Sequence, residues 1–279
     1  MFIVAVFAFY PIFYSVYLSL HRIVLGMPFL GEPFVGFANY GELLHDRVAI
    51  KSLLNTLIFV FSTTFCEILL GLGVALIMNR AFRGRGLVRA AVLVPWAIPT
   101  VVSSQMWRFI YNDKYGLLNY LIFGTAEAKY RAWLADPFFA FVGVIVADIW
   151  KASSFAALLI LAGLQTIPDD LYEAARIDGA GAWQRFRSIT FPLVKPAILI
   201  ALLFRTMDGF RVFDLIFVMT QGGPADSTNV LQFYGYKKIF AEGLMGYGSA
   251  ISVVVFLITL ATAIFYIKFI GTRLFRKRT

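Results

Sequence analysis

The stretch EAARIDGAGAWQRFRSITFP, residues 173–192, decides how this chain is interpreted. It is polar and lies between two long apolar segments. A simple connection between two helices needs only a few residues. This stretch and its lead-in predict about two helical turns over 169–177, a glycine break at Gly179 and a second amphipathic piece that ends at Pro192. A loop with that much internal structure is typical of a docking surface on one side of a membrane.

The composition places the chain in a membrane. Hydrophobic residues make up 60% of it, charged residues 15%, and the mean hydropathy is +0.77. A soluble domain carries about 25% charged residues. The single cysteine, Cys66, lies in an apolar run, so neither a disulfide framework nor a cysteine-based metal site is expected. Since no G-x-x-x-x-G-K-[ST] motif occurs, an ATP-driven function would need its ATPase on another polypeptide.

The net charge of +9 could suggest a nucleic-acid partner, but the distribution of the basic residues argues against one. One basic cluster contains Arg80, Arg83, Arg85 and Arg89, and a second contains Lys268, Arg273, Arg276, Lys277 and Arg278. Both clusters flank apolar segments, as the positive-inside bias of membrane proteins produces. We therefore expect lipid rather than nucleic acid around this chain.

A membrane-spanning helix needs about 20 apolar residues. Six segments qualify: 1–20, 53–78, 87–111, 138–164, 196–220 and 244–270. The first lacks a basic n-region and an A-x-A-like cleavage site, so it is interpreted as a retained helix and not as a signal peptide. The predicted fold is an all-α membrane protein with six transmembrane helices in a single domain, residues 1–279.

Six spans place both termini on the same side of the membrane. Basic residues concentrate in the 80–89 loop, the 173–192 loop and the C-terminal tail, whereas the opposite loops mix acids and bases. The positive-inside rule then predicts that both termini are cytoplasmic. Residues 168–192 would form a cytoplasmic loop.

Prolines and glycines predict where the spans bend or approach each other. Pro95 and Pro99 should break the third span, which a bilayer tolerates where neighbouring helices or a cavity satisfy the freed carbonyl groups. This bend is either a packing kink or an element that opens and closes a pathway. Gly71 and Gly73 on the second span predict close contact with another helix.

The 173–192 stretch resembles the E-A-A, three residues, G, nine residues, I-x-L-P signature of permease subunits of ATP-binding cassette importers. Phe191 stands where the signature has Leu. Thr220-Gln221-Gly222-Gly223-Pro224 after an apolar helix and Asn55-Thr56 in the second span extend the resemblance to the carbohydrate branch of that family and to essentially the whole chain.

This resemblance implies the type I importer permease fold in a bacterial or archaeal cell membrane. The implied partners are a second homologous permease subunit, two ATPase subunits that hold ATP–Mg²⁺, and an extracytoplasmic solute-binding protein. The chain itself would be no enzyme and would carry no cofactor, no metal and no catalytic residue. The outer turn at 222–224 and the loop to Tyr236 would meet the binding protein.

The resemblance also assigns coupling to the ATPase. The residues assigned are Glu173, Ala174, Ala175, Gly179, Ile189 and Pro192. Small side chains allow close approach to a partner, Gly179 can turn the chain after the helix, and Pro192 would close the motif where the chain turns into the fifth span. An interfacial helix lying on lipid is the alternative, but such a helix presents a broad basic face, whereas acids dominate the first turns here.

The fifth predicted span carries four charged residues: Arg205, Asp208, Arg211 and Asp214. A charge in mid-membrane costs at least about 2.5 kcal/mol, so these groups should pair or line a wet cavity. A shared face joins Arg205, Asp208, Gly209 and Val212. One interpretation is a sugar site in which Asp and Arg bind hydroxyl groups and Gly209 leaves space for a ring. The other is structural pairing between helices.

Two more spans carry polar residues. Asp148, Trp150, Lys151, Ser153 and Ser154 form a polar and aromatic belt on the fourth span. Of these, Trp150, Lys151 and Ser154 are added as candidate substrate-binding residues. Phe210 and Phe213 could stack on a sugar or meet lipid. Glu67 on the second span is expected to be a structural partner of another residue.

The predicted function is import of a sugar by alternating access, with an α-linked disaccharide such as trehalose or maltose as the preferred cargo. A glycerol-3-phosphate importer is the first alternative, because Arg205 and Arg211 would suit a phosphate, although each has a nearby acid. An ion-coupled secondary transporter with Asp208 or Glu67 as a proton relay is the second, and a structural membrane scaffold is the third.

Overall fold

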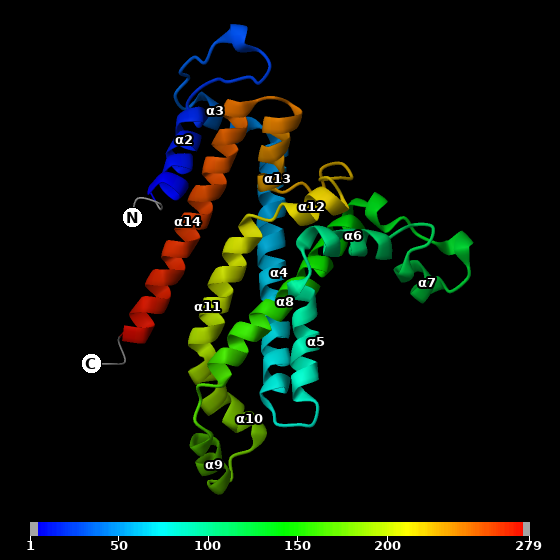
Figure 1. Cartoon of the computed structure of the whole chain (residues 1–279), viewed down its shortest axis with the longest axis vertical. Coiled ribbons are helices and arrows are strands. Elements are labelled where there is room, and N and C mark those ends of the chain that lie inside the picture. The colour runs from blue at the N-terminus through cyan, green and yellow to red at the C-terminus, as the bar shows by residue number, and fades with distance from the viewer. Residues whose placement is uncertain (1–4, 276–279) are drawn as a thin grey trace. The chain divides into compact units, whose positions relative to one another are not determined.

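The computed structural model describes residues 5–275, and this part of the chain is built from helices (Figure 1). In hydrocarbon every backbone N–H and C=O group must find a partner within the protein, so the apolar stretches become helices. The long helices are α4 (Arg47–Asn79), α8 (Pro137–Leu164), α11 (Phe191–Phe210) and α14 (Met245–Phe275). Within residues 5–275 no strand forms; two isolated bridges pair His21 with Phe34 and Val24 with Leu244.

Shorter helices connect the long ones. The α-helices are α2 (Tyr10–Ser19), α3 (Ala38–His45), α5 (Arg85–Ala97), α6 (Thr100–Ile110), α7 (Leu117–Phe123), α9 (Asp169–Ile177), α10 (Ala182–Arg185), α12 (Asp214–Met219) and α13 (Leu231–Tyr236). Short 3₁₀ turns occur at η2 (Pro28–Leu30), η3 (Glu127–Lys129) and η4 (Trp133–Ala135). Wider π-helical turns occur at η1 (Ala5–Phe9), η5 (Phe186–Thr190) and η6 (Lys237–Ala241).

In the described part of the chain, four helical stretches are long and apolar enough to cross a membrane: Arg47–Asn79, Pro137–Leu164, Ala182–Phe210 and Met245–Lys268. The pair α5 and α6 makes a fifth span if it counts as one broken helix. Of the first predicted span, residues 1–4 lie outside the described part, and the ten-residue α2 with the five-residue η1 is too short to qualify. A sixth span therefore stays a prediction, as does the side on which the termini lie. Arg276, Lys277 and Arg278 of the tail also lie outside the described residues.

The predicted break of the third span is confirmed. The helices α5 and α6 are bent by 92° at Ile98 and Pro99. Pro95 lies inside α5, whereas Pro99 stands in the gap between the two helices. A proline has no N–H to continue the helix, and it pushes the preceding residue into extended backbone, as Ile98 shows with ψ 131°.

The prediction for the fifth span was wrong at both ends. We expected a turn at Pro192, but the helical run from Ala182 to Phe210 passes through this residue. The π-turn η5 precedes it and gives the carbonyl oxygen of Phe186 the N–H of Phe191 as a partner. At the other end α11 stops at Phe210, so α12 is a separate helix and the single span over 196–220 does not form.

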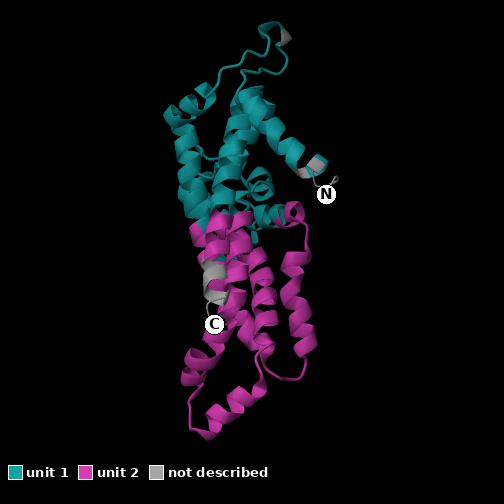
Figure 2. Ribbon diagram, turned by 90° about the vertical axis from the view of Figure 1, so that its left-hand side faces the viewer, with its two compact units in different colours: residues 1–60, 104–144, 209–261 teal, residues 61–103, 145–208, 262–279 magenta. Residues whose placement is uncertain are grey.

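The chain forms two compact units (Figure 2). The first unit comprises residues 1–60, 104–144 and 209–261, and the second comprises residues 61–103, 145–208 and 262–279. The core of the first unit gathers Ala49, Leu231, Tyr234, Tyr247, Ile251 and Val255. The core of the second unit includes Met78, Ile160, Leu164, Val194 and Ala201. The single permease domain expected over 1–279 stays a prediction.

One of the two predicted glycine contacts is present in the second unit. A Cβ on Gly71 would lie 2.8 Å from the Cβ of Ala156, so α4 and α8 approach closely there. Gly73 has no atom within 4 Å of such a Cβ and is exposed. The expected contact at Gly73 is therefore wrong, because two positions along a helix point in different directions.

A carboxylate in the first unit holds the start of α4 against two other helices. The Oδ1 of Asp46 accepts the backbone N–H groups of Val48 (2.9 Å) and Ala49 (3.2 Å), which caps α4. Its Oδ2 accepts the hydroxyl groups of Tyr234 and of Tyr247 (2.7 Å). Burial alone would raise the pKa of Asp46, but these four hydrogen bonds outweigh it and hold the pKa below its ordinary value of 3.8.

Replacing Asp46 should weaken the packing of α13 on α4. We expect Asp46→Ala to destabilise the first unit by about 1.5–3 kcal/mol more than Asp136→Ala does, because only Asp46 adds tyrosine hydroxyls to its cap. Asp136 is the matched control: it caps α8 through the N–H groups of Phe138 (2.9 Å) and Phe139 (3.0 Å). Hydrogen exchange of the α13 amides measures the difference.

The pH dependence has a defined sign. Because folding lowers this pKa, the stabilisation by Asp46 is complete above the unfolded value and is lost as the pH falls through the lower folded one. The stability difference between wild type and Asp46→Ala should thus be constant above about pH 5 and shrink only below it. A difference that instead grows on acidification would contradict this account of the carboxylate.

Candidate functional site

The loop predicted from the opening stretch, residues 168–192, has the expected local structure and lies within the second unit. The helix α9 begins after Pro168, and two acids in its first turn suit the positive end of the helix dipole. It ends at a left-handed glycine, because Gly179 has φ +79°. The N–H groups of Gly179 and Ala180 donate to the carbonyl oxygens of Arg176 (3.0 Å) and Ala175 (2.9 Å), which is a Schellman cap.

The residues of this loop divide into an exposed set and a set that holds the loop in place. Glu173, Ala174 and Gly179 are exposed, and so are the large side chains of Ile177 (87%) and Trp183 (71%). An exposed apolar surface on a rigid loop is typical of a docking site. Figure 1 shows α9 and α10 together near the first turn of α11.

One predicted coupling residue, Ile189, helps to hold the loop in place. Ile189 packs against the core of the second unit, as does Tyr172 of α9, whose hydroxyl lies 3.0 Å from the Oγ1 of Thr190. These contacts fix α9 to the helical run that enters α11. Pro192 lies within that run and does not turn the chain.

The centre of the second unit contains one guanidinium group among three carboxylates. The Nε of Arg205 lies 2.7 Å from the Oε2 of Glu67, and its Nη2 lies 3.1 Å from Oε1. Asp148 is 3.4 Å from Nη2, and Asp208 is 3.5 Å from Nη1. Glu67 is fully buried and Arg205 nearly so, whereas the Asp208 side chain is 47% exposed.

This geometry confirms the structural role expected for Glu67. A two-point contact between a guanidinium and a carboxylate is among the strongest side-chain pairs, and it links α4 to α11. Asp148 adds α8 to the same contact. Arg205 therefore acts first as a partner of acids, and Asp208 is the member of this cluster that reaches towards solvent.

The helix face that Arg205, Asp208, Gly209 and Val212 were predicted to share is only partly present. Because α11 ends at Phe210, Arg211 and Val212 lie in a bend and Asp214 begins α12. Gly209 does not open space for a ring: a Cβ there would lie 3.2 Å from Val60 of α4, so this glycine serves close helix packing in the first unit. The helical period of the sequence predicted one continuous helix here. The structure instead has a break between Phe210 and Asp214 that the sequence analysis did not predict.

The aromatic residues near this bend pack on protein. Phe210 is buried, and Phe213 lies 5.5 Å from Phe217 and 4.9 Å from Tyr236, measured between ring centroids. These rings form an aromatic cluster in the first unit with Phe233. These ring contacts account for the position of the Phe213 side chain, and no ligand is needed to explain it.

Lys151 stabilises the break between α5 and α6. Its Nζ donates to the carbonyl oxygens of Pro95 (3.4 Å), Trp96 (3.5 Å) and Ile98. Pro99 cannot supply the N–H that the oxygen of Pro95 would meet in a continuous helix. A cation at the C-terminal end of α5 is also favoured by the helix dipole.

The other two candidates on α8 differ in exposure. Ser154 is buried, and Trp150 is half-buried. One turn after Lys151, Phe155 stacks on Trp96 with 5.7 Å between ring centroids. The end of α5 is thus held on α8 by hydrogen bonds from an ammonium group and by an aromatic contact, neither of which was predicted from the sequence.

The predicted outer turn is present in the first unit. The N–H of Gly223 donates to the carbonyl oxygen of Thr220 (3.0 Å), and Gly222 has φ +82°, which suits a glycine. Asn55 and Thr56 hold the segment that follows the turn. The Nδ2 of Asn55 donates to the carbonyl oxygens of Asp226 (3.1 Å) and Asn229 (3.0 Å). The Oγ1 of Thr56 accepts the N–H of Leu231 (2.8 Å).

Long apolar helices, a proline-broken span and a rigid polar loop define a multi-pass membrane protein of the permease class. The family described as "Binding-protein-dependent transport system inner membrane component" matches residues 67–276. The chain belongs to this family. The resemblance inferred from residues 173–192 is thereby confirmed, and the chain is a transport subunit and not an enzyme.

Curated relatives and solved structures agree with this assignment. The chain is 44% identical to the trehalose/maltose transport system permease protein MalF of Thermococcus litoralis, over 95% of this chain and 89% of that protein. It is 41% identical to the trehalose transport system permease protein SugA of Mycobacterium tuberculosis, over 94% and 83%. A chain in the crystal structure of a bacterial ABC transporter for alginate import shares the fold, with TM-score 0.83, 22% identity and coverage of 96% and 91%.

Removing the ammonium group of Lys151 should loosen the break between α5 and α6. We expect Lys151→Met to destabilise the protein by about 1–3 kcal/mol, because carbonyl oxygens that are in part buried lose their donor. Lys151→Arg, which keeps a cationic donor, should lose much less. Thermal unfolding of the purified protein measures the effect, with Lys195→Met on α11 as the control. Equal losses for the methionine variants at positions 151 and 195 would show that the carbonyl contacts contribute nothing.

Proposed function

We propose that this chain is the transmembrane subunit of an ATP-driven importer that carries a sugar into a bacterial or archaeal cell by alternating access. The preferred cargo is an α-linked disaccharide such as trehalose or maltose. The observation that carries this proposal is the similarity, at 41–44% identity over nearly the whole chain, to two permeases named for trehalose transport.

The charge arrangement in the second unit supports a neutral cargo over glycerol-3-phosphate. A phosphate would have to approach Arg205, but three carboxylates already lie within 3.5 Å of its guanidinium. Like charges at that distance would repel the phosphate. An ion-coupled transporter that uses Glu67 as a relay is also disfavoured, because Glu67 is fully buried and bonded twice to Arg205.

For the sugar site itself we propose that Asp208 contacts the cargo and that Arg205 positions it. Asp208 is the most exposed carboxylate of the cluster, and an ionised carboxylate accepts hydrogen bonds from neighbouring sugar hydroxyls. Trp150 offers an aromatic surface from α8. Lys151, Ser154, Gly209 and Val212, which were also predicted from the sequence, would act through packing and backbone support.

The working complex would contain a second permease, two ATPase subunits that hold ATP–Mg²⁺ and an extracytoplasmic binding protein. The loop over 168–192 is the proposed ATPase contact: α9 is rigidly capped at Gly179 and fastened through Tyr172, while Ile177 and Trp183 stay exposed. The segment from Gly222 to Tyr236 is the proposed contact with the binding protein.

Uptake and ATPase activity of the reconstituted complex test the proposal. We expect trehalose or maltose, delivered with the binding protein, to stimulate ATP turnover, while glycerol-3-phosphate does not. Asp208→Ala should reduce sugar uptake at least about tenfold, since it removes a charged hydrogen-bond partner of the cargo.

Asp214→Ala is the matched control, because this exposed aspartate begins α12 and lies outside the cluster. Assembly of the complex must be verified for both variants. Stimulation by glycerol-3-phosphate alone would overturn the sugar assignment. Unchanged uptake in an assembled Asp208→Ala complex would remove Asp208 from the site.

A further inference from the structure

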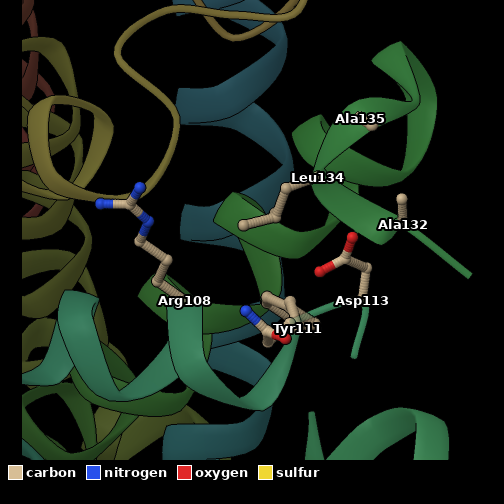
Figure 3. Close-up of a pocket in the computed structure, with 7 residues that line it drawn as sticks. Arg108, Tyr111, Asp113, Ala132, Leu134 and Ala135 are labelled. Atoms are coloured by element: carbon tan, nitrogen blue, oxygen red, sulfur yellow. The ribbon is translucent and has the colours of Figure 1, made fainter. Parts of the chain in front are cut away.

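A cavity of about 300 Å³ lies in the first unit, where α6 ends and the chain returns ahead of α8 (Figure 3). One wall carries Arg108, Tyr111, Asn112 and Asp113. The other wall carries Leu134 and two alanines around η4. The volume is at the lower end of the range of about 300–1,000 Å³ for ligand pockets, which suits a single small ring.

A buried asparagine holds the two walls together. The amide nitrogen of Asn119, on α7, donates to the carbonyl oxygens of Asn112 (3.1 Å) and Arg131 (3.0 Å). Its amide oxygen accepts the N–H of Arg131 (3.0 Å) and the Nε1–H of Trp133 (2.9 Å). Since one fully buried side chain bonds to both walls, the cavity keeps its shape without a ligand, and binding there costs little ordering.

Polar groups that line the cavity keep hydrogen-bonding capacity for a ligand. Within residues 5–275, neither the guanidinium of Arg108 nor the carboxylate of Asp113 has a hydrogen bond or an ion pair. In the view of Figure 3 the side chain of Arg108 lies to the left of Leu134 and that of Asp113 to its right. The Oδ1 of Asn112 accepts the N–H groups of Lys114 (2.9 Å) and Tyr115 (3.2 Å), so its amide nitrogen remains as a donor.

This set of groups selects a neutral, polyhydroxylated ligand. The charges of Arg108 and Asp113 cancel. An anion in the cavity would be repelled by Asp113, and a cation would be repelled by Arg108. A carboxylate can accept from two neighbouring hydroxyls, and a guanidinium and an amide donate to others. Leu134 and the alanines offer an apolar surface for the C–H groups of a ring.

We propose that this cavity binds one ring of a neutral sugar, as a subsite made only from residues of the first unit. Asp113 accepts hydrogen bonds from two adjacent hydroxyls, and Arg108 and Asn112 donate to the remaining oxygens. The proposal rests on the proposed function, since it gives the imported sugar a second contact that does not use Asp208.

A fluorine label at Trp133 tests the subsite locally. The full transport complex is prepared with 5-fluorotryptophan, and the Trp133 resonance is assigned by Trp133→Phe. Its shift is then followed by ¹⁹F NMR as trehalose, maltose or inorganic phosphate is added. We expect the disaccharides to shift the Trp133 signal, and phosphate to leave it unchanged. Asp113→Asn, which keeps the side-chain shape, should weaken the sugar response about tenfold or more.

Glu127→Gln is the matched control, because Glu127 is an exposed acid on the same connection that does not line the cavity. It should leave the titration unchanged. A wild-type complex that takes up the sugar without any shift at Trp133 overturns the subsite and leaves the proposed function standing. A shift without uptake of any sugar supports the subsite and overturns the function. A response to the sugar-free binding protein alone, or to phosphate alone, also overturns the sugar assignment.

Discussion

The contact between Arg205 and Glu67 is the one on which the second unit depends. Glu67 is fully buried on α4, and the guanidinium of Arg205 meets both of its carboxylate oxygens from α11. Removing one partner of a buried pair leaves an uncompensated charge and typically costs about 3–5 kcal/mol. With Asp148 of α8 at 3.4 Å, the same guanidinium fixes three helices relative to one another.

The same physical requirement explains the other polar residues of the helices. In an apolar surrounding, a charge or a carbonyl group needs a partner within the protein. Lys151 provides that partner for the carbonyl groups at the end of α5, where Pro99 interrupts the helix. In the first unit, the carboxylate of Asp46 accepts hydrogen bonds from the first N–H groups of α4 and from two tyrosine hydroxyls. Polar side chains in this protein therefore determine where helices can break and where they must meet.

Local features of the structure could be predicted from the sequence. The helix over 169–177, the left-handed Gly179, the break at Pro99 and the turn at Gly222 each follow from a few adjacent residues, so their outcome does not depend on distant contacts. The structural role of Glu67 was also predictable, because a lone acid in an apolar helix must be paired.

Features that depend on other helices could not be predicted. The passage of the helix through Pro192 needs the π-turn before it, and the end of α11 at Phe210 has no proline to mark it. The site residues show the same limit: the sequence did not reveal that Lys151 donates to carbonyl oxygens at the end of α5 or that Gly209 packs on Val60. Their partners are far away in the sequence, so spacing alone could not reveal them.

A double-mutant cycle on the buried pair tests the central claim most directly. The apparent free energy of unfolding of the purified complex is measured for Glu67→Gln, Arg205→Met and the double variant. If the pair holds α4 to α11, each single variant should lose about 3–5 kcal/mol and the double variant should lose far less than the sum. Strictly additive losses would contradict the claim, because they would mean that the two side chains contribute independently.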